Sequence, residues 1–300
     1  MKMSKPILAV FIGPAIITYL IAFIYPIIRT TYMSFFDLEI VTDPMYMWTF
    51  VGIENFVILF TQSPLFIQSL YNILRLWIVG GLVVFTLALL FAAFLTSGVR
   101  FKSFFRAVIY LPNVVAAVAM GTMWIQYVFN ARFGIINVFL GFFGHPGIQF
   151  TSPDLIFWAM LIAYCFGMVG WFLLVFMAAI DGIPYDYFEA ALLEGAGFFA
   201  RFFKITLPLI LENIRNSIVL WSVAMVNFFV WPMVFSPFMP IVGTVSPVVY
   251  MYQMVFGGMI VAQVQRNVGV GAAIGVVLSV IVVTIFAVTS VLFRKAKVEF

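Results

Sequence analysis

Residue types that support catalysis or metal binding are scarce in this sequence. It has one histidine, His145, and one cysteine, Cys165, which lies inside an apolar run. A lone cysteine excludes an internal disulfide and argues against a metal cluster. The sequence also lacks the Gly-x4-Gly-Lys-Ser/Thr loop that cradles phosphates, so it has no usual ATP site. We therefore expect a protein that is not an enzyme and that needs no cofactor or metal.

Polar residues that could contact a ligand stand inside long apolar segments instead. Asn216, Asn227 and Trp231 recur at nearly helical spacing, so their side chains are expected to share one helix face. Such a face suits a sugar, because amides bond hydroxyls and an aromatic ring stacks on the C–H side of the sugar. Interhelical hydrogen bonding and packing is the alternative. Asn113 and Tyr164 are weaker candidates for the same substrate pathway.

One loop, residues 181–208, combines glycine, proline and charged residues between two apolar segments. Pro184 suits the first turn of a short helix, where its missing N–H costs nothing. Asp186 falls in that turn, where the helix dipole favours an acidic residue. Gly195 permits the left-handed backbone that ends a helix. The loop therefore predicts two short helices joined by a glycine turn, with Pro208 at the entry to the next apolar segment.

The composition makes the lipid bilayer the main solvent of this chain. Hydrophobic residues make up 65% and charged residues 9% of its 300 residues, and the mean hydropathy is +1.18. Soluble proteins carry roughly 25% charged residues. The net charge of +4 does not indicate nucleic-acid binding, because the basic residues flank apolar segments, where anionic lipid accounts for them.

Six apolar runs are each long enough to cross a hydrocarbon core. We expect one all-α transmembrane domain over residues 1–300, with spans at about 7–35, 73–98, 107–129, 155–179, 209–235 and 268–293. The 181–208 loop then lies between the fourth and fifth spans. Residues 236–267 are interrupted by proline and glycine, which favours a loop or re-entrant segment with a short helix near 249–256. Residues 53–70 suggest an interfacial amphipathic helix, a docking surface for an extracytoplasmic partner, or both.

The orientation is indicated by the basic residues, most of which fall on one side of the six-span arrangement. They are Lys2, Lys5, Arg100, Lys102, Arg106, Arg201, Lys204, Arg294, Lys295 and Lys297. The positive-inside rule makes that side the cytoplasm, together with both termini and the 181–208 loop. The first apolar run has no small-x-small cleavage signal, so we expect it to be a retained span rather than a signal peptide.

The 181–208 loop resembles the Glu-Ala-Ala motif of binding-protein-dependent ABC import permeases. That pattern is Glu-Ala-Ala, three residues, Gly, about nine residues, then Ile-x-Leu-Pro. The matching residues are Glu189-Ala190-Ala191, Gly195 and Ile205-Thr206-Leu207-Pro208. Likeness to the maltose and glycerol-phosphate group extends over Tyr25-Pro26, Glu54-Asn55-Phe56, Leu111-Pro112 and Gly134-Ile135-Ile136-Asn137. The sequence departs from that group after Pro232, where many relatives carry a Gly-rich stretch.

The resemblance implies a coupling helix that docks in a cleft of a separate ATPase subunit and transmits its motion to the spans. The coupling residues would be Asp186, Glu189, Ala190, Ala191, Gly195, Arg201 and Pro208. It also implies a second, related permease, two ATPase subunits and an extracytoplasmic solute-binding protein in a bacterial inner membrane. The expected solute is a sugar or oligosaccharide.

Two other functions fit parts of the sequence. An ion-gradient-driven secondary carrier or channel would also need many spans, but no acidic residue lies deep in an expected span, where such carriers bind protons or sodium. A membrane scaffold would use the 181–208 helix only as an interfacial anchor. The spaced motif favours coupling over both.

Overall fold

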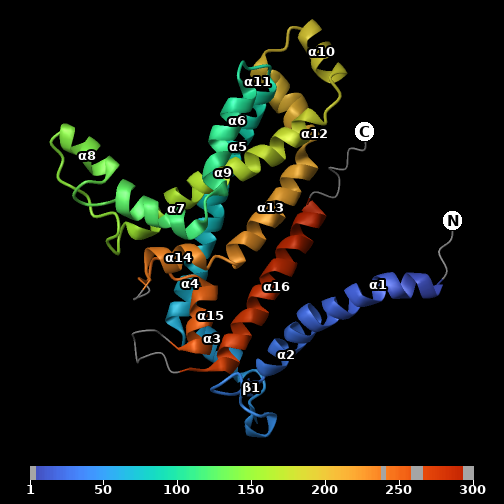
Figure 1. The fold of residues 1–300 in the computed structure, drawn as a ribbon, viewed down its shortest axis with the longest axis vertical. Coiled ribbons are helices and arrows are strands. Elements are labelled where there is room, and N and C mark those ends of the chain that lie inside the picture. Colours follow the sequence, from blue (N-terminus) through green and yellow to red (C-terminus); the bar gives the residue numbers. More distant parts are fainter. Residues whose placement is uncertain (1–4, 238–240, 258–265, 293–300) are drawn as a thin grey trace. The chain divides into compact units, whose positions relative to one another are not determined.

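The computed structural model describes residues 5–237, 241–257 and 266–292, with side chains from residue 10 onward. The described chain is helical almost throughout (Figure 1). It divides into two compact units, residues 1–67 with 250–280 and residues 68–249 with 281–300. Three helices, α4, α15 and α16, contribute residues to both units.

The first unit begins with a long helix followed by a small strand pair and a short helix. Its elements are α1 (Lys5–Tyr19), a π-helical turn (Leu20–Ile24), α2 (Tyr25–Met33), β1 (Phe36–Asp37), a 3-10 turn (Met45–Met47), β2 (Thr49–Phe50) and α3 (Glu54–Thr61). The strands pair antiparallel, with Phe36 opposite Phe50. Buried Asn55 donates from Nδ2 to the carbonyls of Ser34 at 3.0 Å and Phe36 at 2.9 Å. This amide fixes the chain where α2 ends.

The second unit is built around α9. Its first elements are α4 (Pro64–Arg75), a π-helical turn (Leu76–Gly80), α5 (Gly81–Thr96), α6 (Lys102–Val114), α7 (Ala117–Met123), a π-helical turn (Trp124–Val128), α8 (Ile135–Phe142) and α9 (Ile156–Asp181). Helix α9 packs against both α5 and α6. The most apolar window of α9 is 67% buried, against 39% for the α4–α5 helix, so α9 forms the centre of this core.

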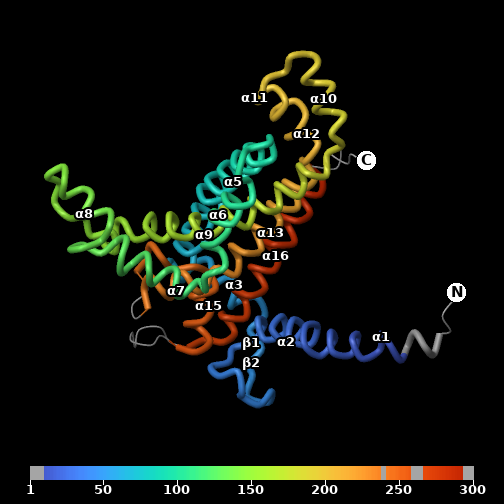
Figure 2. Tube along the Cα trace, turned by 45° about the horizontal axis from the view of Figure 1, so that its top comes forward, coloured from blue at the N-terminus to red at the C-terminus, as the bar shows by residue number. Residues whose placement is uncertain are grey.

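The remaining elements are those of the 181–208 segment and the helices after it. They are α10 (Asp186–Leu193), α11 (Phe198–Arg201), a π-helical turn (Phe202–Thr206), α12 (Leu207–Leu209), α13 (Leu211–Val226), α14 (Val230–Phe235), α15 (Pro247–Phe256) and α16 (Val268–Leu292). The tube in Figure 2 shows α10, α11 and α12 together beyond one end of α5, whereas α8 projects on the opposite side.

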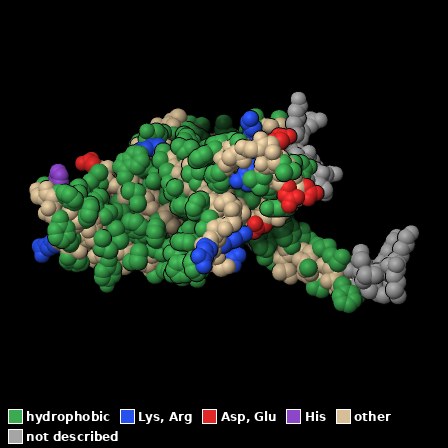
Figure 3. All heavy atoms as spheres, turned by 90° about the horizontal axis from the view of Figure 1, so that it is seen from above, with side chains coloured by type: hydrophobic (Ala, Val, Ile, Leu, Met, Phe, Trp, Pro, Cys, Tyr) green, Lys and Arg blue, Asp and Glu red, His purple; other side chains and the backbone are tan. Residues whose placement is uncertain are grey.

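The described helices confirm an all-α membrane protein. Four of them are long and apolar enough to cross a bilayer alone, and two bent pairs bring the number to as many as six. The face in Figure 3 is covered largely by hydrophobic side chains, with charged ones in small groups. In the first span, Val10–Met33, no residue of the most apolar window is buried.

Two of the expected spans are not single helices. Residues 107–129 were expected to cross as one run, but α6 and the α7 helix meet at 97°. Pro112 lacks the N–H that would continue the α6 hydrogen bonds, and Val115 and Ala116 then adopt extended backbone. The expected span 209–235 is also broken, because α13 ends at Val226 and a new helix, α14, starts at Val230. Pro232 falls in the first turn of α14, where proline is well tolerated.

The segment between the first two spans also differs from the expected single interfacial helix over 53–70. Helix α3 ends at Thr61, and Pro64 opens a second helix that continues without interruption to Thr96. The second span therefore belongs to a 33-residue helix that begins before residue 73. The short helix expected near 249–256 is confirmed as α15, whereas residues 238–240 and 258–265 of the same segment lie outside the described residues.

Candidate functional site

The 181–208 segment folds as two helices around a glycine turn, as its punctuation predicts. Helix α10 starts directly after Tyr185, whose carbonyl accepts from the N–H groups of Phe188 and Glu189. Pro184 therefore lies just before the helix rather than in its first turn. Asp186 and Glu189 occupy that turn, where carboxylates oppose the positive end of the helix dipole.

The turn at Gly195 is a Schellman motif that explains the spacing of the Glu-Ala-Ala pattern. Gly195 has φ +75°, its N–H donates to Leu192 at 3.0 Å, and the N–H of Ala196 donates to Ala191 at 2.9 Å. These are the two bonds that close a helix when the residue after its last turn is left-handed. A Cβ at Gly195 would meet no atom within 4 Å. The requirement for glycine there is one of backbone conformation and not of space.

Helix α10 presents an unusual surface for a peripheral helix. Leu193 is 91% exposed and Leu192 is 48% exposed, beside the exposed side chains of Asp186, Glu189 and Ala190. Ala191, in contrast, is buried against this chain. Two exposed leucines flanked by carboxylates make α10 a candidate surface for contact with another protein.

The connection from α10 to α13 is bent twice. Gly197, in extended backbone, starts a helix that runs from Phe198 to Leu209, and this helix meets α13 at 68°. Ile210 is buried at the bend. Pro208 was expected at the entry to the fifth span. It lies instead in α12, the last helical turn before the bend that leads into α13. Two angled joints therefore connect α10 to α13 along the chain.

Arg201 lies behind α10, in the wall of a cavity of about 350 Å³. Asp181, Tyr185 and Phe188 contribute to the same wall. The Nε atom of Arg201 is buried and has no hydrogen-bond partner among the described residues. Arg201 therefore lies inside the 181–208 segment, at the cavity that Tyr185 and Phe188 also line, and not on the exposed face of α10.

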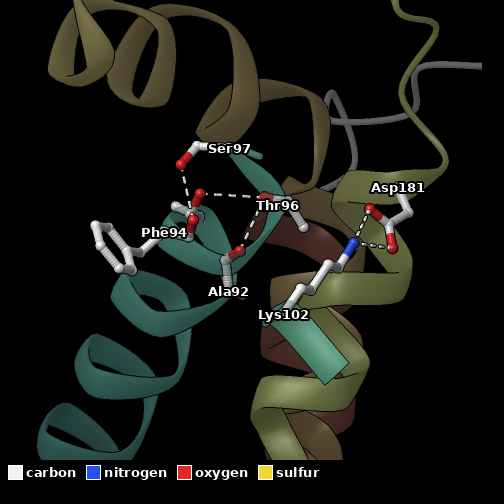
Figure 4. Close-up of polar contacts among 7 residues, drawn as sticks. Ala92, Phe94, Thr96, Ser97, Lys102 and Asp181 are labelled. Atoms are coloured by element: carbon white, nitrogen blue, oxygen red, sulfur yellow. Dashed lines mark hydrogen bonds and ion pairs between the residues drawn. The ribbon is translucent and has the colours of Figure 1, made fainter. Parts of the chain in front are cut away.

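The polar groups at the neighbouring ends of α5 and α9 are already paired (Figure 4). Lys102 Nζ lies 3.2 Å from Asp181 Oδ1, which joins the start of α6 to the end of α9. Thr96 and Ser97 donate their hydroxyl protons to carbonyls of their own helix, at 2.8 Å to Ala92 and 2.7 Å to Phe94. These side chains support the ends of the helices under the 181–208 segment.

The expected substrate-pathway residues do not form one face. Asn216 is exposed and accepts hydrogen bonds from its neighbour Arg215, and Asn227 is exposed at the end of α13, where its amide donates to Val223 at 3.0 Å. Trp231 is buried on α14. The helix break after Val226 separates Trp231 from the two asparagines, because spacing along the sequence fixes a common face only within one helix.

Trp231 and Tyr164 are nevertheless brought together, since their ring centroids lie 5.5 Å apart. Asn113 is half-buried and donates to the carbonyl of Gly167 at 3.2 Å, tying α6 to α9. Of the expected pathway residues, the structure therefore brings Tyr164 and Trp231 into contact, and the amide of Asn113 is hydrogen-bonded within the protein.

A further tryptophan, which sequence patterns did not single out, organises this region. Trp221 is 1% exposed, donates from Nε1 to the carbonyl of Trp77 at 3.0 Å, and contacts the rings of Phe85, Tyr164 and Phe172. We call these five residues the Trp221 cluster. In return, Trp77 Nε1 donates to Ser222 Oγ at 2.8 Å.

Two adjacent glycines make room for the Trp221 cluster. A Cβ on Gly81 would lie 2.9 Å from Trp221 Nε1, and one on Gly80 would lie 3.1 Å from the same ring. In the sequence, the only sign of this close packing was the pair of adjacent glycines inside an apolar run. A tryptophan elsewhere in the chain could not be matched to them without the fold.

Comparisons with known proteins agree with this arrangement. Residues 84–298 match the family model described as "Binding-protein-dependent transport system inner membrane component". The chain is 29% identical over 265 residues to the diacetylchitobiose uptake system permease protein NgcF of Streptomyces coelicolor, covering 82% of this chain and 71% of that protein. It is 32% identical over 219 residues to the sn-glycerol-3-phosphate transport system permease protein UgpA of Escherichia coli O157:H7, covering 70% and 72%.

The fold has a counterpart among solved structures. A chain in the crystal structure of a bacterial alginate ABC transporter, in complex with an alginate pentasaccharide-bound periplasmic protein, superposes with a TM-score of 0.80. The two chains are 22% identical, and the match covers 98% of this chain and 96% of the other. The family match over most of the sequence, together with the helical membrane fold, identifies the chain as a member of the binding-protein-dependent transport system inner membrane component family.

Proposed function

We propose that this chain is the permease subunit of an ATP-driven ABC importer that moves a sugar or oligosaccharide into the cytoplasm. The observation that carries the proposal is α10, whose exposed leucines and carboxylates end at a Schellman turn on Gly195. In this proposal α10 docks on a separate ATPase subunit, and Asp186, Glu189 and Ala190 face it. Ala191, Gly195 and Pro208 shape the helix and its connection to α13, while Arg201 supports the segment from behind.

The proposal includes three further kinds of partner: a second permease, ATPase subunits and a solute-binding protein. In this assignment a second, related permease pairs with this chain to form the pathway. Two ATPase subunits supply ATP hydrolysis, so this chain itself is no enzyme. An extracytoplasmic binding protein delivers the solute, in keeping with the periplasmic protein named with the alginate transporter. We place the assembly in a bacterial inner membrane with both termini cytoplasmic, because basic loop residues concentrate on that side.

The solute class rests on two kinds of support. Relatives are named for diacetylchitobiose and sn-glycerol-3-phosphate uptake, and the structural neighbour imports alginate. Within this chain, the rings of Tyr164 and Trp231 meet edge to face, with their centroids 5.5 Å apart. We propose that Trp231 and Tyr164 contact the solute, with Asn113 beside them, and that Asn216 and Asn227 are secondary contacts.

Affinity purification of this chain from its native membrane tests the assembly. Mass spectrometry should identify an ATPase, a second permease and a solute-binding protein. The reconstituted complex should take up radiolabelled diacetylchitobiose, glycerol 3-phosphate or an alginate oligosaccharide only with ATP. Uptake that continues without ATP and stops with an ionophore would establish a secondary carrier and contradict the proposal.

Topology is tested by cysteine labelling in a Cys165→Ala background. A membrane-impermeant maleimide should react in intact spheroplasts with a cysteine at Glu54 and fail to react with one at Asp186. Labelling of Asp186→Cys from outside, with Glu54→Cys unreactive, would show that the topology is the opposite of the one proposed.

A further inference from the structure

Arg75 is a cation without an anionic partner in the part of the chain that the structure describes. Its guanidinium carbon lies 4.2 Å from the ring centroid of Phe157, 5.0 Å from Trp158 and 5.3 Å from Tyr71. No hydrogen bond or ion pair to Arg75 occurs among the described residues, whereas Lys102 and Arg215 have carboxylate partners. The three rings hold the guanidinium in place but do not neutralise its charge.

The level of Arg75 in the membrane is set by helix lengths. Twenty-one residues separate Arg75 from Thr96, the last residue of α5, which corresponds to about 32 Å at a rise of 1.5 Å per residue. Trp158 lies twenty-three residues before Asp181, the end of α9, or about 35 Å. The hydrocarbon core is about 30 Å thick. Since Lys102 pairs α6 with Asp181 close to the end of α5, Arg75 and Trp158 reach the opposite interface, at the depth of lipid phosphates.

An apolar surface leads from this cation towards the bilayer centre. On α9, Ile162 is 49% exposed and Phe166 is 47% exposed, one and two turns beyond Trp158. Both residues line a hollow of about 570 Å³ between α5, α6 and α9, in which the other lining side chains are almost all apolar. The hollow also holds Trp124, whose Nε1 is buried and has no partner among the described residues.

We propose that Arg75 and this hollow form a binding site for one phospholipid. The phosphate binds the guanidinium between Tyr71 and Trp158, and an acyl chain follows Ile162 and Phe166 into the hollow. Charge complementarity selects this occupant, because a guanidinium at the depth of lipid phosphates forms charge-assisted hydrogen bonds with them and the surface below it is apolar. In the topology proposed above, the lipid comes from the outer leaflet.

The head group and the acyl chain of the lipid contribute to binding through different residues, so substitutions can test them one at a time. Arg75→Gln removes the cation and leaves the hollow open. Ile162→Trp fills the hollow and leaves the cation. Arg132→Gln is the matched control, because Arg132 is an exposed cation in a loop and lines no part of the hollow.

The experiment is native mass spectrometry of the complete importer, delipidated in mild detergent and then offered phosphatidylglycerol or diacylglycerol with the same chains. Wild type and Arg132→Gln should retain phosphatidylglycerol roughly tenfold better than diacylglycerol, the ratio expected for one charge-assisted hydrogen bond. Arg75→Gln should lose this preference, and Ile162→Trp should retain little of either lipid.

Three outcomes would overturn the proposal. Equal phosphatidylglycerol retention by Arg75→Gln and wild type would show that the guanidinium binds no phosphate. Displacement of the lipid by inorganic phosphate at millimolar concentration would show a site for a free anion. Loss of the second permease from the Arg75→Gln complex would show that this surface contacts protein. Lipid retention is measured without transport, so failure here leaves the import assay, and the proposed function, to be judged separately.

Discussion

The 181–208 segment and the Trp221 cluster hold their shapes by different means. The segment depends on backbone: a left-handed glycine and two N–H bonds end α10, while most of its side chains are exposed. The cluster depends on packing, because Trp221 is buried among aromatic rings and fits against Gly80 and Gly81. A surface segment can therefore be specified by a few local residues, whereas the packed body from which it departs must be specified by contacts between distant ones. In the function proposed above, the segment is a lever and this body is what it moves.

Truncation of the buried ring should have the largest energetic effect. Trp221→Ala removes a fully buried indole and leaves a cavity between α13 and the helix at Gly80 and Gly81, which costs about 3–5 kcal/mol in protein cores. We expect a clear drop in the thermal unfolding midpoint of the detergent-solubilised protein. Leu220→Ala is the control, because Leu220 is the preceding residue and is 53% exposed. Equal shifts for both variants would show that the cluster is no more important than the surface.

A substitution at the glycine turn should destabilise the protein less than Trp221→Ala does, but it should reduce import more. Gly195→Val places a β-branched residue at φ +75°, which strains the backbone by roughly 1–2 kcal/mol. The turn should shift α10, so that membrane insertion and pairing with the second permease persist while import and ATPase stimulation are lost. Glu189→Ala should weaken coupling in the same direction to a smaller degree, because it leaves the backbone path intact. Import into reconstituted vesicles and copurification of the ATPase are the measurements.

Two variants control for the added side chain in that experiment. Gly197→Val introduces the same residue where φ is −68° and ψ is 173°, a conformation open to any residue, with no atom within 4 Å of its Cβ. Its import should be close to wild type. Gly195→Asn should retain more import than Gly195→Val, since asparagine tolerates the left-handed region. Loss of import in Gly197→Val as well would assign the effect to bulk and not to backbone.

The pathway residues provide a second contrast within the membrane region itself. Trp231→Ala removes a buried ring from the side of Tyr164, whereas Asn227→Ala removes an exposed amide that bonds only within its own turn. We expect Trp231→Ala to reduce import several-fold while assembly and basal ATPase activity persist, and Asn227→Ala to have a smaller effect. Normal import of the true solute by both variants would assign both residues to packing.

The contrast between local and distant contacts also explains what could be predicted from sequence. Helix α10 and its end were predictable because Asp186 and Gly195 act on their nearest neighbours along the chain, although Pro184 lies just before the helix and not in its first turn. The bends at Val115 and Val226 were not, since Pro112 and Asn227 stand inside runs long enough to cross a bilayer, and membrane helices tolerate such residues without breaking. The common face of Asn216, Asn227 and Trp231 failed for the same reason, because it assumed one helix. The pairing of Trp221 with Gly80 and Gly81 joins positions about 140 residues apart, and no local pattern encodes it.

The ion pair between Lys102 and Asp181 should have the smallest effect on stability. Its side chains are 36% and 54% exposed, and exposed pairs contribute about 0–1 kcal/mol because water and salt screen them. Lys102→Ala should therefore leave the unfolding midpoint within about 1–2 °C of wild type, and added salt should erase the remaining difference. The pair nevertheless joins α6 to the end of α9 from which the 181–208 segment departs, so import should be measured alongside stability. If Lys102→Ala and Asp181→Asn both unfold normally and import normally, the pair is an incidental surface contact. If they unfold normally but lose ATPase stimulation, α6 belongs to the lever with α10, and the boundary between lever and packed body moves into the membrane domain.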